Sequence, residues 1–196
     1  GKHYTYRVGE LKPENIKDVI EGNPKTDYPG PSRKPVLCPG CPHRAVFVAL
    51  RKSKVTVSGD IGCYTLGSLP PLAALHSTIC MGASVTIFES FSKFIGHDKV
   101  VGVLGDSTFV HSGITGLINA AYNKGKGVLL ILDNGTTGMT GAQPNPATGV
   151  TAKGEKTKKL DLEAICRACG ADHVEVVNLS SESIDIKLKE LLPKDQ

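Results

Sequence analysis

Two apolar runs, Val100-Val101-Gly102-Val103-Leu104-Gly105 and Gly127-Val128-Leu129-Leu130-Ile131-Leu132, are followed by the polar residues Asp106-Ser107 and Asp133-Asn134. Neither run alternates apolar with polar side chains, which is typical of parallel strands that are covered on both faces. Between the runs, the segment His111–Lys126 carries apolar residues at helical spacing, namely Ile114, Leu117, Ile118, Ala121 and Tyr122. The sequence therefore predicts a strand–helix–strand unit with two buried parallel strands, and hence an α/β fold.

The polar residues after the two runs point to a ligand site. In open α/β sheets, ligands bind just beyond the carboxyl ends of the strands, where Asp106 and Asn134 both fall. Mg²⁺ takes carboxylate, amide and carbonyl oxygens together with ligand phosphates, so Asp106, Asn134 and the carbonyl of Thr136 are candidate ligands. Small residues nearby would let backbone N–H groups approach a phosphate: Gly105, Ser107, Gly135, Gly138 and Gly141. The alternative is an ordinary strand-to-helix turn capped by Asp106 or Ser107, and the second motif at Asn134 argues against it.

These motifs resemble those of a known family. The triplet Gly105-Asp106-Ser107, followed later by Asn134-Gly135-Thr136, resembles the thiamine diphosphate motif, a Gly-Asp-Gly triplet with a downstream Asn. The stretch Asn134–Gln143 is similar to the 2-oxoacid:ferredoxin oxidoreductases, which commonly read Asn-x-x-Tyr-Gly-Met-Thr-Gly-Gly-Gln there. The chain departs from these patterns at three positions, and the departures look most like the large subunits of indolepyruvate:ferredoxin oxidoreductases: Thr137 for Tyr, Ala142 for the second Gly, and Ser107 for the third Gly of the triplet. The resemblance covers about Pro35–Gly149 and continues more weakly to Leu192.

The resemblance implies a fold and a set of site residues. The fold would be a three-layer, parallel-sheet thiamine diphosphate-binding domain, with Mg²⁺ held by Asp106, Asn134 and the Thr136 carbonyl. The residues implied near the cofactor are Gly62, Cys63, Cys80, Met81, Gly82, Gly105, Asp106, Ser107, Asn134, Thr136, Gly138, Met139 and Thr140.

The resemblance also implies a reaction and its partners. A 2-oxoacid, indolepyruvate or another aryl pyruvate, would be oxidatively decarboxylated to an acyl-CoA, and the electrons would pass to ferredoxin. The glutamate that activates thiamine diphosphate would come from a partner pyrimidine-binding domain, which no segment here resembles. A second subunit and a dimeric or hetero-oligomeric assembly are implied as well, so we expect this chain alone to be inactive.

The cysteines carry a second motif. Cys38-Pro39-Gly40-Cys41 has the spacing of a zinc site, a redox dithiol or an iron–sulfur site, and Cys63 follows a strand-like run that could return to the same place. By resemblance, Cys38, Cys41 and Cys63 would ligate a [4Fe–4S] cluster, for which the sequence identifies no fourth thiolate. Cys166 and Cys169 repeat the spacing on a predicted helix, where cysteines are usually small buried apolar groups.

The histidines do not indicate a hydrolase. His43 follows the cysteine pair, as in the family pattern, and either lies near the cluster or cofactor or caps the next helix. His76 precedes the segment around Cys80, and His111 falls where a packing or capping role is expected. None of these three histidines is placed to act as the base for a nucleophilic serine or cysteine. The sequence therefore lacks the catalytic triad of a hydrolase.

Length and composition fit one α/β domain. The chain has 196 residues, 40% hydrophobic residues, 22 glycines and a net charge of +4. Its lysines, in Lys153–Lys159 and Lys187–Lys194, are not interleaved with aromatic residues, which argues against nucleic-acid binding. There is no signal peptide and no apolar run of membrane length, so we expect a cytoplasmic protein with reduced cysteines.

The expected organisation is a linker, residues 1–34, with a short helix near Pro13–Gly22, followed by the binding domain, residues 35–196, as a fragment of a larger polypeptide. A basic loop, Thr151–Lys159, either closes over the site or has no fixed structure. The other expected elements are helices at His43–Arg51, Ile79–Phe94 (buried), Leu160–Cys169 and Ser181–Leu192, and strands at Val55–Ser58 and His173–Val177.

Three other functions remain open. A thiamine-dependent decarboxylase or synthase without a cluster would share the metal motif. A noncatalytic zinc-binding module would use Cys38, Cys41 and Cys63 but leave Asp106 and Asn134 without a role. A nucleotide-binding domain would use the glycine-rich turns, but the sequence has no Gly-x-x-x-x-Gly-Lys motif and no strong Gly-x-Gly-x-x-Gly motif.

Overall fold

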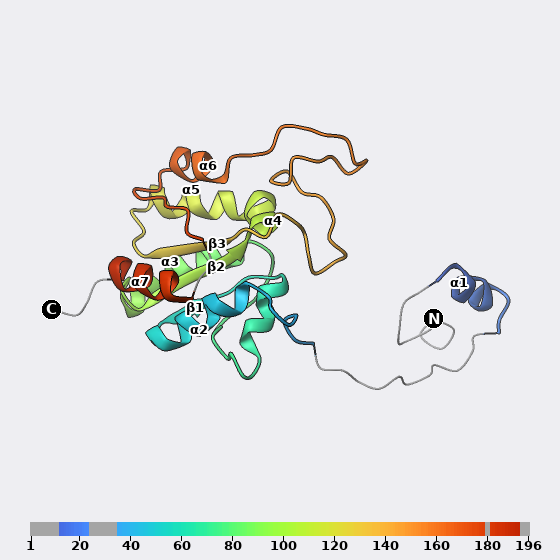
Figure 1. Ribbon diagram of the computed structural model, residues 1–196, viewed down its shortest axis with the longest axis horizontal. Helices are drawn as coiled ribbons and strands as arrows, with labels where there is room; N and C mark the ends of the chain where they lie inside the picture. The colour runs from blue at the N-terminus through green and yellow to red at the C-terminus, as the bar shows by residue number, and fades with distance from the viewer. Residues whose placement is uncertain (1–11, 24–34, 179–180, 193–196) are drawn as a thin grey trace. The chain divides into compact units, whose positions relative to one another are not determined.

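A computed structural model describes residues 12–23, 35–178 and 181–192 of the chain (Figure 1). The chain divides into two units, Gly1–Pro35 and Val36–Gln196. In the first unit, helix α1 (Pro13–Ile20) confirms the predicted short helix, and a proline in its first turn suits a helix start. The remainder of the predicted linker, residues 1–11 and 24–34, lies outside the described residues.

The second unit is built on a parallel sheet. Strands β1 (Thr56–Ser58), β2 (Val100–Gly105) and β3 (Val128–Leu132) lie in the order β1-β2-β3. Val57 aligns with Val101, and Leu104 aligns with Ile131. The predicted parallel α/β unit is therefore confirmed.

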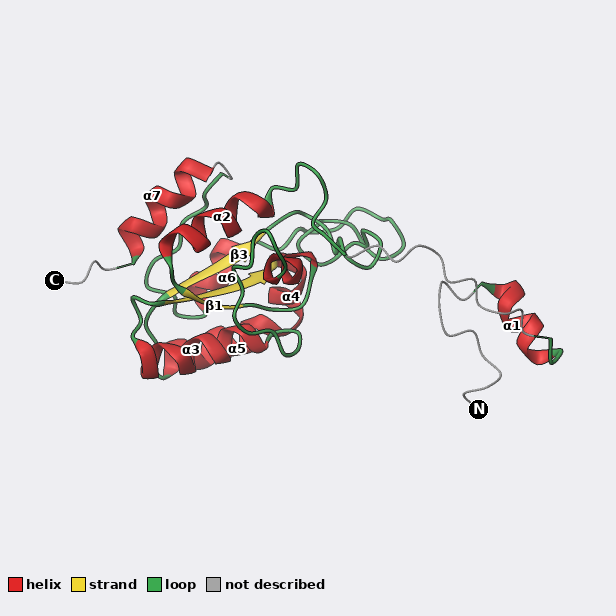
Figure 2. Cartoon of the chain, turned by 90° about the horizontal axis from the view of Figure 1, so that it is seen from below, coloured by secondary structure: helices red, strands yellow, loops and turns green. Residues whose placement is uncertain are grey.

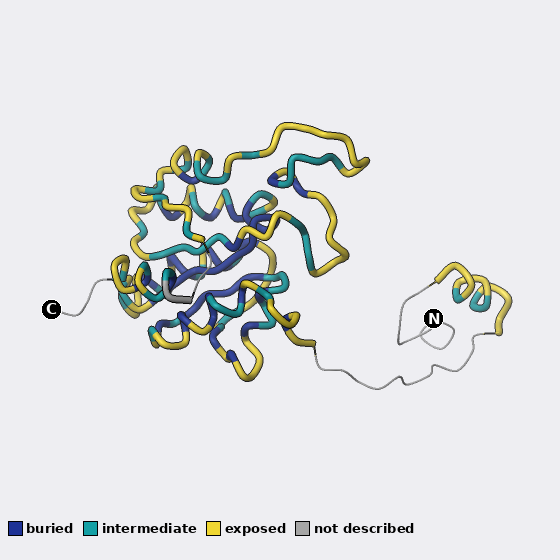
Figure 3. Tube along the Cα trace, in the orientation of Figure 1, coloured by how far each residue is buried: buried dark blue, intermediate teal, exposed yellow. Residues whose placement is uncertain are grey.

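Helices cover both faces of the sheet. Figure 2 shows α2 (His43–Ser53) and α7 (Ser181–Leu191) on one face, with α3 (Ala83–Ile95) and α5 (Ile114–Tyr122) on the other. This arrangement confirms the predicted three-layer class. The central strand, β2, is buried along its whole length (Figure 3).

Each face of the sheet has its own core. Val101 and Val103 of β2 pack with α2 and α7, whereas Leu104 packs with α3, the following helical turn and α6 (Leu162–Ala168). Gly102 points toward α3, because a Cβ there would lie 2.7 Å from Leu129 Cδ1 and 3.1 Å from Phe88 Cβ. A glycine at this position lets the helix lie close to the strand.

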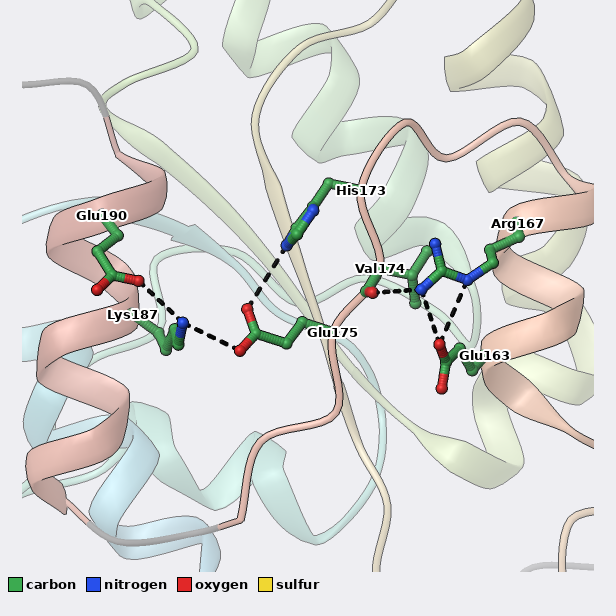
Figure 4. A network of polar contacts seen from close by, with 7 residues as sticks. All are labelled: Glu163, Arg167, His173, Val174, Glu175, Lys187 and Glu190. Carbon is green, nitrogen blue, oxygen red and sulfur yellow. Dashed lines mark hydrogen bonds and ion pairs between the residues drawn. The ribbon is translucent and has the colours of Figure 1, made fainter.

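The predicted strand His173–Val177 is wrong. The segment is irregular and joins no sheet within the described residues. Side chains hold it instead (Figure 4): the Arg167 guanidinium donates to the Val174 carbonyl at 2.7 Å, and Glu175 pairs with Lys187 of α7 at 3.0 Å. Val176 is 75% exposed, so the valines of this segment do not form a buried strand face.

The predicted helix Ile79–Phe94 begins later than expected. Gly82 has a left-handed backbone (φ +86°), so α3 starts only at Ala83. Ile79 and Met81, which precede the helix, are exposed. Within α3, Val85 and Phe88 are buried whereas Phe94 is exposed, so the helix is buried on one side only.

The predicted helix His111–Lys126 instead begins directly after β2. The chain turns into α4 (Asp106–Thr108), continues through the π-helical turn η2 (Phe109–Gly113) and then forms α5. Asp106 is therefore the first residue of a continuous helical segment, and His111 lies exposed within the π turn. Single π-helical turns such as η2 are frequent at functional sites.

Other predicted elements agree more closely with the structure. Helices α2, α6 and α7 and strand β1 match their predicted positions within a few residues. Strand β3 is only half-buried over Val128–Ile131, because it is at the edge of the described sheet. The basic loop is a hydrogen-bonded turn, in which Val150 pairs with Lys156 and the Gly149 carbonyl accepts from the Thr157 N–H at 3.0 Å. No helix in the described ranges is long and apolar enough to cross a membrane.

Two valines on α2 provide a test of the packing. Val46 is 1% exposed and Val48 is 39% exposed. We expect Val46→Ala to lower the free energy of unfolding by about 2 kcal/mol, because it removes two buried methyl groups and leaves a cavity. The change Val48→Ala alters helix propensity identically but should cost less than about 0.5 kcal/mol. Urea unfolding of both variants measures this, and equal losses would contradict the described orientation of α2.

Candidate functional site

The carboxyl ends of the three strands bring polar residues to one edge of the sheet. Asp60 follows β1, Asp106 follows β2, and Asp133 and Asn134 follow β3. Because the strands are parallel and adjacent, these residues lie on the same side of the sheet, where ligands bind in α/β folds.

Asp106 is a buried carboxylate without a cation. It is 2% exposed, and within the described residues it takes part in no ion pair. Burial raises the pKa of its carboxyl above the ordinary value, although hydrogen bonds from Asn145 and nearby backbone N–H groups oppose this effect. The N-cap residue of α4 is Gly105, and no side chain caps this helix end. The alternative that Asp106 only caps a helix therefore does not account for it. A buried carboxylate is costly unless a cation or strong donors compensate it, so this position fits a divalent metal ion.

The segment after β3 forms a compact turn. Asn134 Oδ1 accepts from the Thr136 N–H at 3.2 Å, and Asp133 Oδ1 accepts from the Gly135 N–H at 2.9 Å. Such side-chain-to-backbone bonds stabilise a turn in which Gly135 takes a left-handed backbone (φ +65°). The Asn134 side chain and the Thr136 carbonyl thus both belong to a single preorganised turn.

Hydrogen bonds tie this turn to the end of β2. Thr137 Oγ1 donates to Ser107 Oγ at 2.9 Å, which joins the β3 loop to the helix that starts at Asp106. Farther along, Thr140 Oγ1 donates to Gln143 Oε1 at 2.7 Å, and the Thr137 N–H donates to the Gln143 carbonyl at 3.0 Å. Two motifs separated in the sequence therefore form one connected network.

Asn145 is the principal site residue that the sequence did not predict. It is 5% exposed, and its Nδ2 donates to Asp106 Oδ2 at 3.2 Å and approaches Thr137 Oγ1 at 3.5 Å. Its Oδ1 accepts from the Ala147 N–H at 2.8 Å, which fixes the orientation of the amide. Asn145 thereby holds one carboxylate oxygen of Asp106. Its position in Gln143-Pro144-Asn145-Pro146, a turn-forming stretch, was the only local signal.

Asp60 is a second buried carboxylate with a structural role. It is fully buried and accepts backbone N–H groups of Ile61 at 2.7 Å, Gly82 at 2.9 Å and Ser84 at 3.0 Å. These three bonds satisfy its charge and fix the turn that leads into α3. Asp60 thus positions Gly82, one of the residues implied near the cofactor.

A buried tyrosine, Tyr64, packs against the residues that precede Asp106. The Tyr64 hydroxyl bonds to the Ile61 carbonyl at 2.7 Å and to Thr108 Oγ1 at 2.8 Å, and burial raises the pKa of Tyr64 to about 12. A Cβ on Gly105 would lie 2.6 Å from the Tyr64 ring, so the glycine before Asp106 is needed for this contact. Gly62 also lies against this ring, since a Cβ on Gly62 would be 2.5 Å from Tyr64 Cε1.

His43 packs edge-on against Tyr64, with ring centroids 6.4 Å apart. Burial lowers the pKa of His43, and the Asp106 carboxylate opposes that effect only partly. The neutral form is therefore favoured, and His43 does not supply the cation that Asp106 lacks. Its Nδ1 is buried and has no hydrogen-bond partner among the residues that the structure describes.

The three motif cysteines are near one another. Cys38-Pro39-Gly40-Cys41 forms a turn in which the Cys41 N–H donates to the Cys38 carbonyl at 3.1 Å and Gly40 has φ +71°. The pKa of the Cys63 thiol is raised by burial and, to a lesser degree, by Cys41 and Cys38. All six cysteines of the chain are free thiols. Within the described part of the chain, however, no three His, Cys, Asp or Glu side chains are arranged to hold a metal ion.

The predicted site residues therefore fall into groups. Asp106 and Ser107 are hydrogen-bonded to the loop that follows β3, through Asn145 and Thr137. Gly138 lies near both Cys63 and Asn134, since a Cβ there would be 3.4 Å from Cys63 Sγ and 3.5 Å from Asn134 Nδ2. Cys80, Met81 and Met139 are exposed on the turns around this edge. Cys166 is buried in α6, as expected for an apolar role.

Comparison with known proteins identifies relatives of the chain. It is 45% identical to indolepyruvate oxidoreductase subunit IorA of Archaeoglobus fulgidus, over 90% of this chain and 31% of the relative. It is 46% identical to the subunit of the same name from Methanothermobacter marburgensis, over 76% of this chain and 25% of the relative. It is 41% identical to the Pyrococcus horikoshii subunit of the same name, over 87% of this chain and 29% of the relative. The chain thus spans less than a third of the length of these relatives, whose names agree with the resemblance inferred from the motifs.

The family described as thiamine pyrophosphate enzyme, C-terminal TPP binding domain, matches residues 60–196. This range includes Asp60, β2, β3 and the loops that follow these two strands, but neither β1 nor the cysteine pair Cys38 and Cys41. This match covers more than half of the chain. The chain belongs to the family of C-terminal TPP-binding domains of thiamine pyrophosphate enzymes.

Proposed function

We propose that this chain is the Mg²⁺- and thiamine diphosphate-holding domain of an enzyme that oxidatively decarboxylates indolepyruvate or another aryl pyruvate. In this proposal the acyl group passes to CoA and the electrons pass to ferredoxin. The observation that carries the metal part is Asp106, a buried carboxylate without a cation at the carboxyl end of β2. The substrate part rests on the names of the relatives, which are indolepyruvate oxidoreductase subunits.

Bound thiamine diphosphate would supply the nucleophile for the 2-oxoacid carbonyl and the electron sink for loss of CO₂. The residues of this chain hold and orient it. Asp106, the Asn134 side chain and the Thr136 carbonyl offer three hard oxygen ligands to Mg²⁺, while the diphosphate would complete the coordination. Asn145 holds Asp106 Oδ2, and the Thr137–Ser107 hydrogen bond keeps the β3 loop against the start of α4.

The remaining predicted cofactor contacts belong to the same proposal. Gly62, Cys63 and Gly82 come from the turns after β1, and Gly138 and Thr140 come from the loop after β3. The activating glutamate, the pyrimidine-binding domain and a second subunit would come from outside these residues, since the relatives are named as subunits and are longer than this chain. A cytoplasmic location stays a prediction.

An iron–sulfur cluster on Cys38, Cys41 and Cys63 is the second part of the proposal. Its support is the proximity of the three thiols, which is visible in the effect of Cys41 and Cys38 on the pKa of Cys63. Cluster binding would require these side chains to converge further and a fourth ligand to join them. The competing functions are a thiamine-dependent decarboxylase or synthase without a cluster and a noncatalytic zinc-binding module.

The substitution Asp106→Asn tests the metal site. We expect Mg²⁺-dependent binding of thiamine diphosphate to weaken at least tenfold, about 1.4 kcal/mol, because the anionic metal ligand is lost. The free energy of unfolding without metal should not fall, since the amide keeps an acceptor for Asn145 and no buried charge remains. Calorimetric titration with and without Mg²⁺, together with urea unfolding, measures both effects.

The exposed Asp172→Asn is the control for that experiment, because it makes the same chemical change away from the site. It should bind thiamine diphosphate as the unaltered chain does. If the chain requires its partner domain for binding, the same comparison is made in the complex. Undiminished Mg²⁺-dependent binding by Asp106→Asn would contradict the proposed metal site.

The cysteine site is tested by metal content. We expect the anaerobically purified chain to hold iron and acid-labile sulfide, with both lost in Cys63→Ser and retained in the exposed Cys80→Ser. Zinc without iron would support the zinc-binding module instead. Three freely titratable thiols at Cys38, Cys41 and Cys63 would support a thiamine enzyme without a cluster.

A further inference from the structure

The opposite edge of the sheet carries a basic cavity. A cavity of about 450 Å³ lies at the amino ends of β1 and β2, between the end of α2 and α7. Its charged lining includes Lys54 after α2, Lys99 before β2 and Lys189 of α7. Since β2 spans the sheet between Lys99 and Asp106, this cavity lies about 20 Å from the proposed metal site. Its volume is in the range of small-molecule sites.

The positive charge of this cavity is only partly neutralised. Four lysines and two aspartates line it, and Lys52 pairs with Asp185 at 3.3 Å. Lys54, Lys99 and Lys189 form no ion pair with the side chains that the structure describes. Three lysines without an ion-pair partner among the described side chains therefore line a common space with one further aspartate, Asp98.

The floor of the cavity is apolar. Val55 is 7% exposed and Leu188 is 1% exposed, and Leu192 completes the lining from beyond α7. A second cavity of about 270 Å³ adjoins the first, since Lys54 and Val55 line both. It adds Arg51 and His76, and Arg51 is held in place by donating to the Leu72 carbonyl at 3.4 Å. Cationic groups around an apolar floor suit an anion that also carries an uncharged portion.

Lys54 occupies a backbone position that glycine favours. It ends α2 with φ +55°, in the left-handed region, where a side chain costs energy and glycine does not. Lys124 has the same conformation (φ +54°) at the end of α5 but lines neither cavity. The conformation alone therefore indicates no function at Lys54. The position of Lys54 between both cavities, beside Lys99 and Lys189, is what sets it apart.

We infer that this amino-edge cavity binds a small molecule bearing two or more phosphate charges. A macromolecular acidic partner fits less well, because the unpaired lysines surround a space of ligand size. The ammonium groups would donate charge-assisted hydrogen bonds to phosphate oxygens, while Val55, Leu188 and Leu192 would contact the uncharged portion. The inference is independent of the proposed metal and cofactor site.

The probes are sodium pyrophosphate and ADP, titrated calorimetrically into the full chain at low ionic strength. EDTA is present, so that metal-dependent binding at Asp106 does not contribute. We expect the unaltered chain to bind both, with an affinity that falls as salt is added. Tighter binding of ADP would indicate a nucleotide, and equal affinities would indicate recognition of the diphosphate group alone.

Variants locate the binding. Lys54→Gly should weaken pyrophosphate binding about tenfold while the melting temperature stays equal or rises, because glycine relieves the left-handed backbone. Lys124→Gly makes the same change in the same conformation and should leave binding unaltered. Lys99→Gln, which leaves the backbone of α2 untouched, should also weaken binding.

Several outcomes would overturn the inference. These are no measurable binding by the unaltered chain, equal binding by Lys54→Gly and the unaltered chain, or equal losses in Lys54→Gly and Lys124→Gly. Binding of polyglutamate that pyrophosphate does not displace would also overturn it, in favour of an acidic macromolecule. Retention of pyrophosphate binding in Asp106→Asn would confirm that the two sites are separate.

Discussion

The parallel pairing of β1, β2 and β3 is the constraint on which the site depends. Because the strands share a direction, the chain leaves each at the same edge, which collects Asp60, Asp106 and Asn134. The helices between the strands return the chain to the opposite edge. Close packing of α3 over Gly102 and of Tyr64 against Gly105 keeps the end of β2 fixed. These contacts position Asp106 at the carboxyl edge.

Two buried carboxylates at this edge have contrasting environments. Asp60 accepts three backbone N–H groups and is satisfied by the protein itself. Asp106 has the Asn145 amide and nearby backbone donors but no cation among the described residues, and burial raises its pKa. The first arrangement is that of a structural residue, and the second supports the proposed role of Asp106 as a metal ligand. Neighbouring His43 does not alter this, because burial favours its neutral form.

Features fixed by local sequence were predictable. The uninterrupted apolar residues of β2 and the Gly105-Asp106-Ser107 turn placed Asp106 correctly, since strand, turn and polar residue are adjacent in the chain. Asn145 could not be predicted, because its contact with Asp106 joins residues far apart in sequence through a loop without periodicity. The start of α3 was misplaced for a similar reason, as it depends on Asp60 holding the Gly82 turn. His173–Val177 was misassigned because its valines favour a strand locally, whereas the segment has no partner strand among the described residues.

The proposed cation site consists of Asp106 and the Asn134 turn, beside a diphosphate. It is tested most directly by crystals of the chain, with its partner domain where binding requires it, containing thiamine diphosphate and Mn²⁺ in place of Mg²⁺. We expect an anomalous scattering peak within coordination distance of oxygens from Asp106, Asn134 and the Thr136 carbonyl. A peak at the motif cysteines, or ordered thiamine diphosphate with no manganese at Asp106, would contradict it.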